Sequence, residues 1–220
     1  MSPEESLAEV RGQIDAACAQ AGRAPGSVNL LAVSKLQPAE AVRRLYAAGQ
    51  RHFGENYAQE LRDKAAALAD LPGLVWHAIG PLQANKAKYV AKLAAYFHAL
   101  DRVEIAAELS RRRAGEPLRC FVEVNVAGES SKSGVAPEAV EPLAEKVRAL
   151  PNLALVGLMA MPPLEAEAEA SRPHFRAVAS LARRLGLAEL SLGSTHDFAV
   201  AIEEGATWVR VGTALFGSRP

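Results

Sequence analysis

Short apolar runs alternate with amphipathic stretches along the whole chain. Near the start, apolar residues recur every three or four positions, which predicts an amphipathic helix over residues 6–21. A β-branched run over residues 28–33 then predicts a strand, and Pro38 is expected to open the next helix in its first turn. The same pattern of strand and helix repeats. Further strands are expected at 52–53, 74–79, 96–100, 118–126, 153–159, 187–192 and 207–211.

Amphipathic segments between these strands are expected to be helices. Their expected positions are residues 57–68, residues 85–93, a segment that begins at Pro137, and a long alanine-rich segment that ends near residue 185. Asp101 and Glu104 also have the spacing of a capping box, in which two side chains bond to the free N–H groups at a helix start. A helix is therefore expected to begin at Asp101.

Eight short apolar strands with helices between them predict a parallel sheet covered by helices. Eight is also the number at which such a sheet closes, so the expected fold is α/β, a (β/α)8 TIM barrel with an extra N-terminal helix. An open, doubly wound sheet is the alternative. Because no linker, charge block or low-complexity segment divides the chain, residues 1–220 are expected to form a single domain.

The charge balance and the cysteine content exclude several classes of protein. The 220 residues carry 25 basic and 25 acidic side chains, so no broad positive field is available for nucleic acid or an anionic membrane surface. No segment approaches the roughly 20 apolar residues of a membrane span. Cys18 and Cys120 are too few for a disulfide framework and are expected to be buried thiols, which favours a cytoplasmic protein.

Candidate chemistry is expected at the carboxyl ends of the strands, where barrels of this kind place their sites. The first strand ends in Val33-Ser34-Lys35, so the Lys35 side chain is expected to reach into the barrel mouth. A lysine partly buried beside another cation has a lowered pKa and can attack a cofactor aldehyde as the neutral amine. The alternative is an ordinary surface lysine at a strand end.

Two turns near the end of the chain are suited to an anion. Thr195 follows the seventh strand in the sequence Gly-Ser-Thr, and Gly212 and Thr213 follow the eighth. Loops after the last two strands of a barrel commonly bind phosphate through backbone N–H groups and small hydroxyls. With Lys35 they predict a site for an aldehyde whose phosphate is anchored across the barrel. Each turn alone is also explained by residues that close a tight loop.

Arg210 lies between Val209 and Val211 in the eighth strand, and alternation turns its side chain to the opposite face from both neighbours. A charge inside a strand needs a partner. Arg210 is expected either to pair with a buried carboxylate or to face the pyridine nitrogen of a cofactor, where a permanent cation keeps that nitrogen unprotonated.

Asn56 and His77 lie near the ends of the second and third strands and are candidates to line the same mouth. His77 is equally explained as a hydrogen-bonded histidine of the core. The loop at residues 129–134 carries a second lysine, Lys132, with a solvated loop as the alternative. The sequence contains no nucleotide-binding glycine motif and no cluster of metal ligands, so no metal site is expected.

Six motifs, in order, resemble those of the pyridoxal phosphate homeostasis proteins, whose barrel is related to the N-terminal domain of alanine racemases. They are LAVSK at 31–35, FGENY at 53–57, WHAIGPLQANK at 76–86, ESSKSG at 129–134, GLMA at 157–160 and VRVGTALFG at 209–217. Each motif alone is weak, but together they span nearly the whole chain and are specific.

This resemblance implies that the chain binds pyridoxal 5'-phosphate (PLP), the vitamin B6 cofactor, as a Schiff base on Lys35. It implies that Asn56 lines the cofactor and that Arg210 lies beside the pyridine nitrogen. The phosphate ligands that it implies are Thr195, Gly212 and Thr213.

Two positions depart from the family pattern. Where the family usually has Met-Ser after the seventh strand, this chain has Ser194-Thr195, which keeps a hydroxyl for the phosphate, followed by His196. Family members often carry another lysine two residues after the Schiff-base lysine, where this chain has Gln37. A role for that extra amine in cofactor transfer therefore cannot be carried over.

The resemblance also implies PLP buffering and delivery, with effects on amino-acid and keto-acid pools, and no robust catalytic activity. A racemase draws its second base from a separate β domain, which we do not expect here, and Arg210 at the ring nitrogen makes a weaker electron sink. The alternative function is a PLP-dependent amino-acid racemase or a Schiff-base lyase that uses Lys35. The expected partners are PLP and apo PLP-dependent enzymes, and a monomer is expected.

Overall fold

The core of the protein is a closed barrel of eight parallel strands, which the computed structural model describes over residues 2–129, 133–163 and 167–217. The strands bond to one another in chain order, and β8 bonds back to β1. They are β1 (Asn29–Val33), β2 (His52–Glu55), β3 (Val75–Ala78), β4 (Tyr96–Leu100), β5 (Leu118–Val124), β6 (Leu153–Ala160), β7 (Glu189–Ser194) and β8 (Trp208–Val211). The prediction of a (β/α)8 TIM barrel is confirmed.

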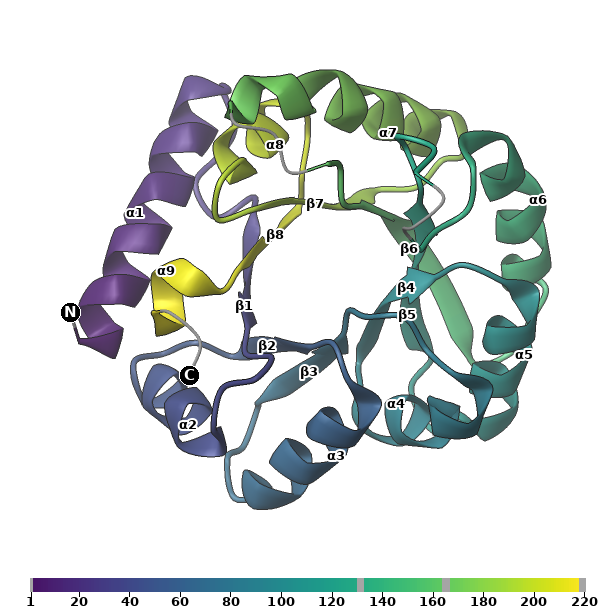
Figure 1. Ribbon diagram of the computed structural model, residues 1–220, viewed down its shortest axis with the longest axis horizontal. Coiled ribbons are helices and arrows are strands. Elements are labelled where there is room, and N and C mark those ends of the chain that lie inside the picture. Colours follow the sequence, from purple (N-terminus) through teal and green to yellow (C-terminus); the bar gives the residue numbers. More distant parts are fainter. Residues whose placement is uncertain (1, 130–132, 164–166, 218–220) are drawn as a thin grey trace.

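Helices form a ring around the barrel (Figure 1). The α-helices are α1 (Pro3–Gln20), α2 (Ala39–Ala47), α3 (Ala58–Ala67), α4 (Ala87–Leu93), α5 (Val103–Arg112), α6 (Pro137–Arg148), α7 (Arg172–Arg184), α8 (Phe198–Glu203) and α9 (Thr213–Phe216), and the 3-10 turns are η1 (Ala84–Lys86) and η2 (Ala168–Ser171). The extra N-terminal helix α1 contacts α8 and α9. In the described part of the chain, no helix is long and apolar enough to cross a lipid bilayer.

The observed strands agree with the expected ones to within two residues at each end, but several helix starts differ. The capping box at Asp101 was wrong, because α5 begins at Val103 and its N-cap residue Arg102 makes no side-chain cap. The Asp101 carboxylate instead accepts a bond from the Arg102 guanidinium at 2.6 Å. Helix α1 starts earlier than expected, at Pro3, because Ser2 and Glu5 form a reciprocal capping box. The expected helix at 85–93 begins as the 3-10 turn η1.

Helices cover the outside of the barrel and side chains fill its interior, so the strands are buried on both faces. This explains their nearly continuous apolar sequences. The interior is nevertheless partly polar, because His77, His98, Ser191 and Arg210 are all buried. Strands β6 and β7 approach closely: a Cβ atom at Gly157 would lie 2.0 Å from the Glu189 carbonyl oxygen, so only glycine fits there. The fold therefore encloses polar groups beneath the mouth of the barrel.

Candidate functional site

Lys35 lies in the turn directly after β1, at the carboxyl end of the barrel, and its side chain is half-buried. The turn leaves the strand sharply, because the next residue, Leu36, has a φ of 61°. That backbone conformation is costly for a residue other than glycine, so contacts from the surrounding structure must hold it.

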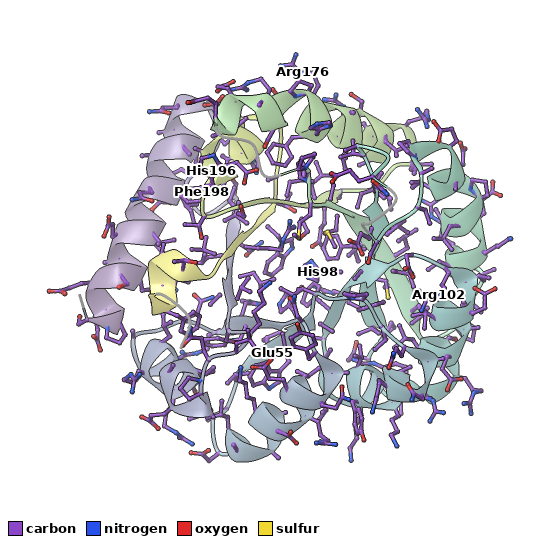
Figure 2. All side chains as sticks on the ribbon, viewed as in Figure 1. Glu55, His98, Arg102, Arg176, His196 and Phe198 are labelled. Carbon is purple, nitrogen blue, oxygen red and sulfur yellow. The ribbon has the colours of Figure 1, made fainter. Side chains whose placement is uncertain are left out.

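A buried ionic network supplies those contacts from behind the turn. The Lys64 ammonium donates to the Ser34 carbonyl at 2.6 Å and to the Glu55 and Glu60 carboxylates at 2.7 Å each. Glu60 also accepts the Leu36 backbone N–H at 2.7 Å, and Glu55 accepts the Ser34 hydroxyl at 2.6 Å. Figure 2 shows Glu55 outside the ring of strands, toward α3. The network fixes the backbone on both sides of the lysine.

Burial raises the pKa of Glu55 to about 7, while Lys64 acts in the opposite direction. The Lys64 ammonium compensates for part of the cost of burying the carboxylate, so the two groups depend on each other.

The turn after β8 lies beside the turn that carries Lys35. The expectation that it lies across the barrel from the lysine was wrong. Ala32 pairs with Val211, because β8 closes the barrel against β1. A Cβ atom at Gly212 would lie 3.4 Å from the Val33 carbonyl oxygen. Gly212 is the N-cap residue of α9, which begins at the exposed Thr213. The first N–H groups of α9 and the Thr213 hydroxyl are therefore placed close to the turn that carries the lysine.

The turn after β7 is held by Asp197. Its carboxylate accepts the Ser194 backbone N–H at 2.7 Å and the hydroxyls of Ser194 and Ser171 at 3.0 Å each. Thr195 and His196 lie between these anchored residues and are exposed. In Figure 2, His196 and Phe198 are neighbours near α8, away from the barrel centre. The Thr195 hydroxyl is thus available at the surface of a fixed turn.

Arg210 reaches the barrel interior, where it is almost fully buried. One nitrogen donates to the carbonyl and the hydroxyl of Ser191 at 2.6 and 2.8 Å, and the other to the Ala160 carbonyl at 3.0 Å. Among the described residues no carboxylate forms a direct ion pair with it. Burial lowers the pKa of Arg210 to about 10, while the negative charges of Asp197 and Glu123 act on the guanidinium and raise its pKa. The guanidinium is therefore charged at pH 7.

Asn56 and His77 occupy different depths of the barrel. Asn56 follows β2 and is half-buried, and the turn after β3 packs against it so tightly that a Cβ atom at Gly80 would lie 2.4 Å from its carbonyl oxygen. His77 is fully buried, and its two ring nitrogens bond to His52 and His98 at 2.9 Å each. These contacts match the alternative of a hydrogen-bonded core histidine. Lys132 lies outside the described residues.

Several polar groups near the barrel axis were missed by sequence reasoning. His52, His98, Ser191 and Glu123 lie on four different strands, and Figure 2 shows His98 near the centre of the barrel. A signal existed for His98, because alternation along β4 puts it on the same face as Tyr96. For the others, only the closed sheet shows which face is interior.

Glu123 is the carboxylate of this set. It lies two residues beyond Phe121, whose ring stacks on His98 at 4.3 Å, and its Oε2 atom is buried without a hydrogen bond among the described residues. Burial, and then the negative charge of Asp101, raise the pKa of Glu123 to about 7, while Arg210 lowers it.

Replacing Glu123 with Gln is expected to remove part of the pH dependence of folding. Between pH 4.5 and about 7, the unfolded chain releases the Glu123 proton while the folded protein keeps it, so stability falls as the pH rises. From pH 5 to pH 7.5 this amounts to about 2 kcal/mol, which E123Q should lack. Urea unfolding of both proteins at the two pH values checks this, with E104Q at an exposed position as control. An identical pH dependence in E123Q and the parent chain would contradict it.

The fold and the candidate site define a class of parallel eight-stranded barrel with a lysine in the turn after β1 and the turn after β8 beside it. Residues 7–220 match the family model described as "Alanine racemase, N-terminal domain". The chain therefore belongs to the alanine racemase N-terminal domain family.

The relatives agree with the more particular resemblance indicated by the six motifs. The Pyridoxal phosphate homeostasis protein of Pseudomonas aeruginosa is 52% identical, over 98% of this chain and 95% of its own. That of Escherichia coli (strain K12) is 44% identical, over 97% and 95%. The resemblance to the pyridoxal phosphate homeostasis proteins is thereby confirmed.

Solved structures show the same fold over the whole chain. PipY of Synechococcus elongatus, in a structure with PLP bound, is 37% identical with a TM-score of 0.84, over 98% of this chain and 100% of PipY. Alanine racemase from Corynebacterium glutamicum has a TM-score of 0.69 at 18% identity, over 99% of this chain and 61% of the racemase. The second likeness concerns the fold alone.

Proposed function

We propose that this protein binds PLP at the carboxyl end of the barrel, as a Schiff base on Lys35, and acts in PLP homeostasis. One observation carries the proposal: the turn that bears Lys35 lies beside the turn at Gly212–Thr213, so an amine is next to backbone N–H groups and a hydroxyl that are suited to an anion. The relatives named pyridoxal phosphate homeostasis proteins, and PipY with PLP bound, support the same ligand.

The residues present suit the parts of this cofactor. The Lys35 amine would hold the aldehyde carbon, and the phosphate would lie against the exposed turns, where Thr195, Gly212 and Thr213 offer hydroxyl and N–H donors. Asn56 would line the ring at the mouth. Arg210 would lie beside the pyridine nitrogen. We leave His77 out of the direct ligands, because other imidazoles occupy both its ring nitrogens.

Bound PLP supplies an electron-withdrawing ring, and the neighbour of the ring nitrogen decides how strongly that ring acts. Arg210 is buried and charged, and it cannot give up a proton as readily as a carboxylic acid can. An unprotonated ring nitrogen makes a weak electron sink, which favours storage and delivery of PLP over turnover. We therefore propose a carrier without robust catalytic activity.

The proposal extends to the setting of the protein. It takes residues 1–220 as one domain that acts as a monomer in the cytoplasm and passes PLP to apo PLP-dependent enzymes. The two cysteines, Cys18 and Cys120, are both buried free thiols, which suits a reducing compartment.

Borohydride reduction of the purified protein after incubation with PLP, followed by peptide mass mapping, tests the proposal. A pyridoxyl group is expected on the peptide that carries Lys35, and a label on other lysines alone would overturn the assignment. In deuterium oxide, loss of the α-proton of L-alanine faster than with free PLP would establish the racemase instead. Trapping of a keto acid on Lys35 without PLP would establish the lyase.

A further inference from the structure

A chain of hydrogen bonds runs through the barrel interior and ends at Arg210. Nδ1 of His52 and Nε2 of His77 are 2.9 Å apart, as are Nδ1 of His77 and Nε2 of His98. Nδ1 of His98 lies 2.9 Å from the Ser191 hydroxyl, which accepts a bond from Arg210 at 2.8 Å. These five side chains come from β2, β3, β4, β7 and β8, so the closed sheet alone brings them together.

The arginine decides which way the protons point along this chain. A guanidinium only donates, so the Ser191 oxygen is the acceptor in its bond with Arg210. Among the described residues, the proton of that hydroxyl has one acceptor, Nδ1 of His98. His98 must then carry its own proton on Nε2 and donate to Nδ1 of His77. By the same step, His77 donates from Nε2 to Nδ1 of His52.

The surroundings of the three histidines in this hydrogen-bonded chain favour neutral imidazoles. His77 stacks on Tyr96 at 4.3 Å, and His98 on Phe121 at the same distance. Burial lowers the pKa of both histidines well below its usual value, and that of His52 to a lesser degree. The charged groups on the strands that carry these five side chains and on β5 are Glu55, which bonds to Lys64, Arg119, which bonds to the Tyr96 hydroxyl, Glu189, which bonds to the Trp208 indole, Glu123, and Arg210 itself.

The end of the hydrogen-bonded chain that is farthest from Arg210 lies at the amino end of the barrel. His52 is the first residue of β2 and is only partly buried. It contributes to a hollow at the amino ends of the strands whose polar lining residues are Arg11, Asp15, Asn29, Gln50, Arg51 and His52. The hydrogen-bonded chain therefore extends from this hollow to the arginine beneath the mouth.

We propose that Ser191, His98, His77 and His52 are positioning residues for Arg210. The arginine sets the Nε2–H tautomer of all three imidazoles, and the ordered chain in turn holds the guanidinium in one orientation. The consequence for the cofactor rests on the proposed function: a fixed guanidinium keeps its charge directed at the ring nitrogen of PLP.

The tautomers can be measured on the full-length protein without PLP. In long-range ¹⁵N–¹H NMR spectra at pH 7, His52, His77 and His98 are expected as neutral rings protonated at Nε2. His196, which is exposed and outside the chain, serves through H196Q as the control for assignment. An Nδ1–H tautomer or an imidazolium at His77 or His98 would overturn the proposal. This result does not depend on whether PLP binds.

The link to the cofactor is tested with Ser191→Ala and the conservative Ser191→Thr. S191A removes the hydroxyl that orients His98, so its ring is expected to populate both tautomers, and PLP affinity to fall on the order of tenfold with a shifted absorbance band. S191T keeps a hydroxyl and should restore the tautomer and the band. An unchanged His98 tautomer in folded S191A would refute the network. If the parent chain binds no PLP, the proposed function fails while the tautomers still decide the network.

Discussion

Replacing Lys35 with Ala is expected to abolish the covalent attachment of PLP. The turn after β1 carries this lysine beside the helix start at Gly212–Thr213, and the second amine at this turn, Lys64, is buried and bonded to two carboxylates. The absorbance band of the Schiff base should disappear, and borohydride should leave no label on this peptide. The turns proposed to bind the phosphate remain, so PLP should still bind reversibly, with an affinity lower by a factor of about 100 or more, since a covalent bond is lost.

Absorbance titration, dialysis and peptide mapping of K35A measure this loss. K88A is the matched control, because Lys88 is an exposed lysine on α4 and its replacement should leave the band unchanged. Circular dichroism establishes that K35A is folded. A K35A protein that retains a reducible adduct at parental yield would remove Lys35 from the proposal and point to another lysine.

Replacing Lys64 with Met is expected to destabilise the fold by about 3 kcal/mol at pH 8 and to disturb the lysine turn. The Lys64 ammonium bonds to two carboxylates and to the Ser34 carbonyl in a buried position. Without it, Glu55 must either stay charged and unpaired or bind a proton. The free-energy cost of binding a proton rises as the pH moves above the pKa that the Glu55 carboxyl has in the unfolded chain. The loss of stability should therefore be smaller near pH 5 than at pH 8.

Urea unfolding of K64M at the two pH values measures this effect. The double variant with Glu55→Gln removes the carboxylate that would be left unpaired, and it should recover part of the lost stability at pH 8. PLP binding should also weaken in K64M, because Leu36 has a strained backbone and depends on the same network. A defect of equal size at both pH values would contradict the ionic explanation.

The local sequence pattern was sufficient for the architecture and for placing the candidate site residues at the ends of the strands. Apolar runs of strand length predicted all eight strands, because a strand buried on both faces must be apolar almost throughout. Polar residues directly after those runs, such as Lys35, Thr195 and Gly212, were placed correctly at the carboxyl ends. The position of a residue after a strand is a property of the chain alone.

The capping box at Asp101 shows the limit of such local rules. The same spacing occurs at Ser2 and Glu5, where it does cap a helix, and at Asp101 and Glu104, where it does not. At the second position the Arg102 guanidinium bonds to the carboxylate and to the Leu82 carbonyl. The carboxylate is therefore occupied by the neighbouring guanidinium, whose position a contact 20 residues away helps to hold.

Which residues from distant parts of the chain contact one another was decided only by closure of the barrel. Ser191 bonds to His98, 93 residues earlier in the chain, and Lys64 of α3 is buried against Glu55 of β2. Closure also put the turn after β8 beside β1, whereas the sequence analysis placed the candidate phosphate turns across the barrel from Lys35. Spacing along the chain carries information about neighbours within a few turns, whereas these contacts depend on how separate strands are arranged around one axis.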